Sequence, residues 1–170
     1  MPRNLELKLK VDNLSQLRET CLSFGANKHA FLKQKDIYYN TEKGLLKLRI
    51  MEDFSEFILY NRNENEGERW SDYQILKISN KEKPEDFFNL IFNPVAVVEK
   101  EREVLLYDNT RIHLDKVKNL GDFLELETVV TSTLDDAKER FNFIVNKLNL
   151  DLDNQIKKSY KNLVLENDSK

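Results

Sequence analysis

In the stretch Arg3-Asn4-Leu5-Glu6-Leu7-Lys8-Leu9-Lys10, polar and apolar residues alternate without a break from Asn4 onward. Side chains on a β-strand point to opposite faces with a period of two, so this stretch predicts a strand with one apolar face and one charged face. Three further stretches, 46–50, 111–115 and 124–127, repeat the alternation. In each of them ionisable side chains share one face, while leucine or isoleucine occupies the other.

The charged faces carry cations and carboxylates together. Their members are Glu6, Lys8, Lys47, Arg49, Arg111, His113, Asp115, Glu125 and Glu127. An open sheet with one solvated face is the ordinary explanation of such alternation. If the sheet instead closes with these faces inward, it forms a charged tunnel, which is too costly unless a ligand or metal neutralises it. A polyanion bound together with a divalent metal needs this mixture of charges, so the pattern predicts a binding site and an enzyme.

The whole chain sets further bounds. Its 170 residues, of which 34% are charged and 40% hydrophobic, predict one globular domain over residues 1–170. The net charge of -3 argues against a broad basic surface for nucleic acid. We expect no secretory signal and no membrane span, because no apolar run is long enough. The single Cys21 cannot form an internal disulfide and lies in a helical pattern, so we expect a core residue and a cytoplasmic location.

The alternation and turn signals predict eight strands. They are expected at residues 4–11, 34–39, 45–50, 57–62, 70–78, 95–107, 110–117 and 122–130. The Asp108-Asn109 pair predicts a hairpin turn, and the polar stretch 63–68 predicts an exposed loop. Antiparallel strands with a few helices indicate an α+β fold, and an eight-stranded antiparallel β-barrel hides the sheet edges.

Helical patterns flank these strands. One helix is expected between an N-cap at Asp12 or Asn13 and Gly25, and another begins at Pro84 and runs through Ile91. A third is expected from its cap at Thr133 through Leu148, and a last short one over 155–163.

Three acids are candidates for a metal site. Glu125 and Glu127 project from one face of a strand at a spacing of roughly 6.5–7 Å. Together with Glu6 they could hold Mg²⁺ or Mn²⁺, which prefer carboxylate oxygens. His113 could be a general base, although a histidine on a strand is more often structural. The sequence contains no glycine-rich phosphate loop, which excludes the nucleotide-binding classes built on one.

Short motifs along nearly the whole chain resemble those of the CYTH domain superfamily, also called the triphosphate tunnel enzymes. The opening 3–8 resembles its ExExK first-strand signature, with Asn4 in place of the first glutamate. Further matches follow in order at 34–38, 46–49, 60–62, 71–73, 100–102, 110–115, 121–127 and 159–160. The subgroup that the chain resembles best is the one labelled class IV adenylyl cyclase-like.

The resemblance implies an eight-stranded tunnel with a triphosphate along its axis, and roles by position. The implied metal ligands are Glu6, Glu125 and Glu127, with Mg²⁺ or Mn²⁺ as cofactor. The implied phosphate-binding residues are Lys8, Lys47, Arg49, Arg62, Lys100, Arg102 and Arg111. Catalytic roles fall to Lys8, Arg111 and Asp115, and weaker lining candidates are Asn4, Tyr38, Ser71, Tyr73 and His113. Asn4 removes a charge from the metal site, which predicts weaker metal affinity.

Four functions remain open at this point. The first is a cyclase that converts ATP to cAMP and pyrophosphate, and the second is a triphosphatase acting on tripolyphosphate, thiamine triphosphate or a nucleoside triphosphate. The third is a non-catalytic binder of polyphosphate or nucleotide. A lipocalin-like carrier would require the leucine faces to point inward. Relatives include dimers, so a homodimer is a further expectation.

Overall fold

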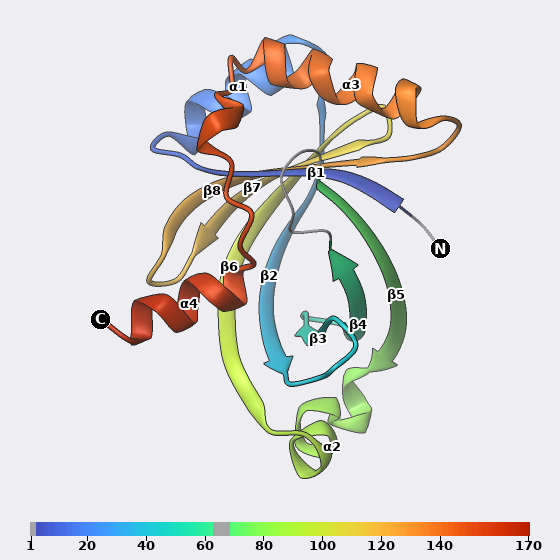
Figure 1. The fold of residues 1–170 in the computed structure, drawn as a ribbon, viewed down its shortest axis with the longest axis vertical. Coiled ribbons are helices and arrows are strands. Elements are labelled where there is room, and N and C mark those ends of the chain that lie inside the picture. The colour runs from blue at the N-terminus through green and yellow to red at the C-terminus, as the bar shows by residue number, and fades with distance from the viewer. Residues whose placement is uncertain (1–2, 63–68) are drawn as a thin grey trace.

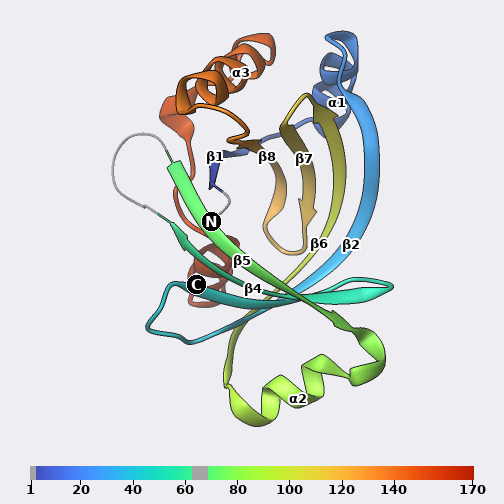
Figure 2. The same ribbon diagram turned by 90° about the vertical axis from the view of Figure 1, so that its right-hand side faces the viewer.

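Eight antiparallel strands close into one barrel in the computed structural model, which describes residues 3–62 and 69–170 (Figures 1 and 2). The strands are β1 (Arg3–Lys10), β2 (Asn27–Tyr39), β3 (Leu45–Ile50), β4 (Phe54–Arg62), β5 (Arg69–Ser79), β6 (Pro94–Tyr107), β7 (Thr110–Val117) and β8 (Gly121–Val129). Their order around the barrel is β1-β5-β4-β3-β2-β6-β7-β8. The expected α+β fold with an eight-stranded barrel is confirmed.

Four α-helices flank the barrel. They are α1 (Leu14–Ser23), α2 (Pro84–Ile91), α3 (Leu134–Lys147) and α4 (Tyr160–Asp168), and the 3₁₀ turns η1 (Asn80–Glu82) and η2 (Leu152–Asn154) accompany them. Three of the α-helices begin at a side chain that accepts a hydrogen bond from a first-turn backbone N–H. These caps are Asn13, Thr133 and Ser159. The first two lie where the sequence places them.

Three elements differ from the sequence-based expectation by three residues or more. β4 begins at Phe54 rather than Phe57, because residues 54–56 pair with β5. β2 begins at Asn27 rather than Gln34, because residues 27–33 pair with β6 even though they lack a clean alternation. The last helix begins at Tyr160 rather than Gln155, because Ser159 caps it and the preceding residues run along β1 instead. The hairpin at Asp108 is confirmed by the pairing of β6 with β7, and Asp108 takes a φ of 48°. The loop expected at 63–68 lies outside the described residues.

The apolar faces of the strands point outward and form the core. Leucines of β1, β7 and β8 pack against α1 and α3, which lie over this side of the barrel (Figure 1). Cys21 is fully buried in the same cluster, as expected. A lipocalin-like interior is therefore wrong, because it would require these leucines to face the cavity. None of the helices among the described residues is long and apolar enough to cross a membrane.

A second apolar cluster lies under α2. Phe88 and Phe92 pack on Tyr39 and Phe57 of the outer face, with the rings of Phe57 and Phe88 stacked at 4.3 Å between centroids. These two clusters lie outside the barrel, so much of the inward surface is left for polar side chains.

Replacing Leu126 by alanine should lower the free energy of unfolding by about 2–5 kcal/mol, because Leu126 is fully buried against the helices. Urea denaturation measures this loss. Leu90→Ala is the matched control, since Leu90 is 85% exposed and its loss should leave the midpoint nearly unchanged. A loss below about 1 kcal/mol for Leu126→Ala would contradict the outward core.

Candidate active site

A cavity of about 680 Å³ runs through the barrel and is lined by side chains from all eight strands and from α4. Most residues singled out by the sequence line it. They are Asn4, Glu6, Lys8, Tyr38, Lys47, Arg49, Tyr73, Lys100, Arg102, Arg111, His113, Glu125 and Glu127. Arg62 and Ser71 pair with each other on β4 and β5, but their side chains lie outside the described part of the chain. The charged strand faces therefore point inward.

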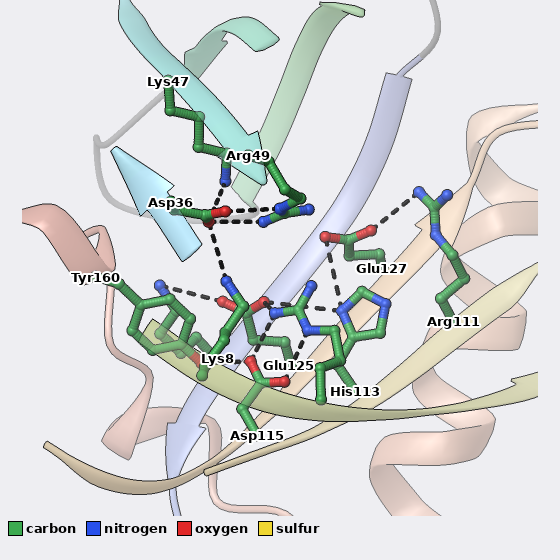
Figure 3. A network of polar contacts seen from close by, with 12 residues as sticks. Lys8, Asp36, Lys47, Arg49, Arg111, His113, Asp115, Glu125, Glu127 and Tyr160 are labelled. Atoms are coloured by element: carbon green, nitrogen blue, oxygen red, sulfur yellow. Dashed lines mark hydrogen bonds and ion pairs between the residues drawn. The ribbon is translucent and has the colours of Figure 1, made fainter. Parts of the chain in front are cut away.

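Three cations converge on Asp36 (Figure 3). Arg49 donates from Nε and Nη2 to the two carboxylate oxygens, each at 2.8 Å. Lys47 Nζ and Lys100 Nζ donate to Oδ2 at 3.1 and 3.0 Å. The ladder register dictates the first contact, because Asp36 and Arg49 lie opposite each other on β2 and β3. We call these four residues the Asp36 cluster.

The Asp36 carboxylate has no exposed surface. Burial alone would raise its pKa, but Arg49, Lys100 and Lys47 outweigh that effect and hold the pKa well below its usual value. Burial lowers the pKa of Lys100 to about 8, although Asp36 opposes this. An ammonium carries three N–H donors and a guanidinium five, so the bonds to Asp36 use only part of what these cations offer. The cluster is therefore a preformed cationic surface with one internal counter-ion.

A second group surrounds Arg102. Its Nε and Nη2 donate to Asp115 at 2.7 and 2.6 Å, and Nη2 also lies 2.6 Å from Glu125 Oε2. Lys8 Nζ lies 3.2 Å from Glu125 Oε1. Tyr160 Oη donates to Asp115 Oδ2 at 2.8 Å. Asp115 has no exposed surface and does not line the cavity. We call these five residues the Arg102 cluster.

A possible metal site adjoins the Arg102 cluster. One ligand atom each from His113, Glu125 and Glu127 lies within 4.8 Å of the others. His113 Nδ1 is buried without a hydrogen-bond partner, 3.8 and 3.9 Å from the two carboxylates. Burial would raise the pKa of Glu127, but His113 and Arg111 lower it to about 2. Two ionised carboxylates and an unused imidazole nitrogen are a donor set that fits a divalent cation.

Glu6 and Asn4, the two residues of β1 that the family signature relates to the metal site, also line the cavity. Glu6 faces Glu127 in the ladder and lines the cavity, but it is not one of the three residues whose ligand atoms converge. Asn4 also lines the cavity, and its buried Oδ1 has no hydrogen-bond partner. An uncharged oxygen is thus present where the family signature has the first glutamate.

The two ends of the cavity differ. At one end, which we call the open end, partly exposed apolar side chains line it, among them Ile75 (47% exposed) and Phe54. Lys77 Nζ lies 4.8 Å from the centroid of the Phe54 ring. At the opposite end, which we call the closed end, inward residues are buried together with the ring of Tyr160 and apolar side chains of the C-terminal segment.

Sequence reasoning missed the roles of Asp36 and Tyr160. Asp36 lies two residues from Tyr38 on a strand, so parity could have placed it inside, but the contact with Arg49 depends on a strand register that alternation does not give. Tyr160 follows the barrel strands on a separate helix. The resemblance includes residues 159–160, but no local pattern shows that the Tyr160 ring enters the site.

Replacing Asp36 by asparagine should lower the free energy of unfolding by about 3–5 kcal/mol at pH 7, because three buried cations lose their counter-ion. The pKa of Asp36 in the folded protein is below its unfolded value, so its stabilising effect is present above about pH 4 and is lost as the pH falls through the lower folded pKa. The difference in the free energy of unfolding between the unmodified protein and Asp36→Asn, measured by urea denaturation, should therefore become smaller towards pH 3.

Glu99→Gln is the matched control for this experiment. Glu99 is 46% exposed at its side chain and pairs with Lys118 at 2.6 Å, so its loss should not change stability measurably. Equal stability of Asp36→Asn and the unmodified protein at pH 7 would contradict the counter-ion role.

Known proteins share this architecture. A Methanocaldococcus jannaschii protein named "Putative adenylate cyclase" is 30% identical over 174 residues, which cover 94% of this chain and 97% of the relative. The PH1012 protein of Pyrococcus horikoshii has a TM-score of 0.77 at 24% identity, covering 95% of this chain and 99% of the other. HpAC1 of Hippeastrum, described as a "putative adenylyl cyclase" with a dominant triphosphatase activity, has a TM-score of 0.67 at 14% identity over 88% of each chain.

The two solved structures are too distant in sequence to show more than a common fold. The CYTH domain, however, matches residues 2–160, which is nearly the whole chain. Together with the closed barrel and its charged interior, this match shows that the chain belongs to the CYTH domain family.

Proposed function

We propose that this protein is a metal-dependent enzyme acting on the triphosphate group of an organic triphosphate, with conversion of ATP to cAMP and pyrophosphate as the leading reaction. The observation that carries the proposal is the pairing, within one cavity, of a preformed cationic surface and a group of metal-binding character. A phosphate chain needs the first, and its divalent cation needs the second.

The cations have a direct role in this proposal. Lys47, Arg49 and Lys100 offer N–H donors to phosphate oxygens, and arginine can bind two oxygens at once. Lys8 and Arg111 also line the cavity, 3.2 Å from Glu125 and 2.9 Å from Glu127 respectively, and would bind phosphate oxygens near the metal. Donors fixed in place before reaction stabilise the charge that develops on a leaving pyrophosphate.

The carboxylates have the complementary role. His113, Glu125 and Glu127 would hold Mg²⁺ or Mn²⁺, with Glu6 and the Asn4 oxygen as further ligands. The ion, when bound, would neutralise charge on the phosphate oxygens. Asp115, which the resemblance places among the catalytic residues, accepts from Arg102 and Tyr160. We assign it to holding Arg102 in place.

In the cyclase reaction the 3′-hydroxyl oxygen would bond to the α-phosphorus as its proton passes to solvent. The bond from that phosphorus to the oxygen that bridges to the β-phosphorus would break, and pyrophosphate would leave. The name of the Methanocaldococcus relative agrees with this reaction. The apolar side chains at the open end also favour an organic substrate, because Phe54 and Ile75 could cover a base whereas a bare phosphate chain has no apolar surface.

A triphosphatase is the second candidate. The same cations would hold the phosphate chain. Water, in place of a sugar hydroxyl, would be the nucleophile, and it would attack the terminal phosphorus and release orthophosphate. The activity described for the Hippeastrum structure supports keeping this reaction. The cytoplasmic location and the homodimer stay predictions.

Purified protein incubated with ATP, thiamine triphosphate or tripolyphosphate and Mg²⁺ or Mn²⁺ should give cAMP and pyrophosphate from ATP, resolved by ³¹P NMR. Orthophosphate without a cyclic product would instead establish the triphosphatase.

Glu127→Gln should reduce metal-dependent turnover at least a hundredfold, because it removes a charged ligand, and EDTA should abolish turnover of the unmodified protein. Full activity of Glu127→Gln would remove this residue from the metal site.

Substitution at the open end should separate organic from inorganic substrates. Phe54→Ala and Ile75→Ala should each weaken ATP binding about fivefold in calorimetry, while tripolyphosphate affinity changes less than twofold, because only ATP has a base to cover. Phe87→Ala is the control, since Phe87 is 57% exposed on α2 and does not line the cavity. Equal losses for both ligands would contradict a base subsite here.

A further inference from the structure

The chain returns to the barrel after its last strand. The backbone N–H of Ile156 donates to the carbonyl of Lys8 at 2.8 Å, and Lys8 Nζ donates to the carbonyl of Lys158 at 3.1 Å. Gln155 Nε2 lies 3.4 Å from the carbonyl oxygen of Glu6. The stretch 155–158 is thereby fixed along β1, and α4 follows it (Figure 1). Tyr160, the first residue of α4, lies in the apolar cluster at the closed end.

Tyr160 is only 4% exposed and its ring lies among cations (Figure 3). Lys8 Nζ is 4.1 Å from the ring centroid, and Lys100 Nζ is 5.3 Å from it. The ring also meets Phe123 edge to face at 5.2 Å between centroids. Both ammonium groups are within the range of a cation–π interaction, which is strongest where water is excluded.

Tyr160, itself a member of the Arg102 cluster, therefore also contacts the Asp36 cluster. Lys100 belongs to the Asp36 cluster, while Lys8 belongs to the Arg102 cluster. The hydroxyl adds a third contact, because it donates to Asp115, which binds Arg102. The residue thus touches or orients three of the cations expected to bind phosphate, although no strand of the barrel carries it.

The geometry points to Tyr160 as a positioning residue that holds the phosphate-binding cations of both clusters in one arrangement before the ligand enters. This inference rests on the proposed function, since it concerns how the same cavity binds a phosphate chain. Lys8 and Lys100 are flexible side chains of like charge, and an apolar face beside each ammonium limits the positions it can take. The affinity for the phosphate chain itself should then depend on the Tyr160 ring.

Substituting Tyr160 should change ligand affinity in a different way from substituting Phe54 or Ile75 at the open end. Losing the ring should weaken every ligand that contains the phosphate chain to a similar degree, whether or not it carries an organic group. Losing the hydroxyl alone should have less effect, because Arg102 keeps its two bonds to Asp115.

The test is calorimetric titration of tripolyphosphate with Mg²⁺ into the full-length protein and its variants. Tyr160→Leu should raise Kd at least tenfold, while Tyr160→Phe should stay within threefold and so act as the conservative rescue. Tyr39→Leu is the matched control, because Tyr39 is also buried and hydrogen-bonded, to Asn89 at 3.0 Å, but lies on the outer face. It should lose thermal stability without a change in Kd.

Several results would overturn the inference. Unchanged affinity in Tyr160→Leu, or an equal loss in Tyr39→Leu, would show that Tyr160 has only a structural role. A tenfold loss in Tyr160→Phe would show that the ring is not what positions the cations. If Tyr160→Leu does not fold, Tyr160→Met, which is also unbranched at Cβ and lacks a ring, takes its place under the same criteria. Absence of binding by the unmodified protein would overturn the proposed function and this role with it.

Discussion

The burial of like charges inside a closed barrel is the constraint on which the rest of this structure depends. Lysine and arginine side chains enclosed without partners would make the fold unstable, since an isolated buried charge is very costly. The chain solves this with internal carboxylates. Asp36 accepts from three cations, and Asp115 with Glu125 surrounds Arg102. The protein can therefore fold with its site already assembled.

This constraint also fixes where the apolar residues go. Because the barrel interior is occupied by ionic groups, hydrophobic stabilisation has to come from the outer faces, and helices must cover them. α1, α3 and α2 supply that cover over different parts of the sheet. The C-terminal segment contributes to the apolar packing and also contacts the charged interior. Its apolar side chains join a cluster at the closed end, and the Tyr160 ring lies against Lys8.

Sequence periodicity predicted which residues of a strand share a face, because odd-numbered and even-numbered residues point to opposite sides of a sheet. The alternation in residues 3–10 gave the strand, its two faces and the identity of the inward residues, because these follow from a period of two. Parity cannot give register, so the contacts of Asp36 with cations on β3 and β6 were not foreseen. The early start of β2 was missed because pairing with β6 outweighs the weak local pattern of residues 27–33.

The charge balance of the cavity indicates which combination of charges it can bind. A bare polyanion would be attracted by Arg49 and Lys47 but repelled by Glu125 and Glu127, because neighbouring cations lower the pKa of each glutamate and keep both ionised. A bare divalent cation would meet the opposite pattern. Under the proposed function, a phosphate chain accompanied by its cation would satisfy both groups, because each charge would then face its complement. The internal carboxylates that allow the empty barrel to fold would thus also make metal and triphosphate bind cooperatively.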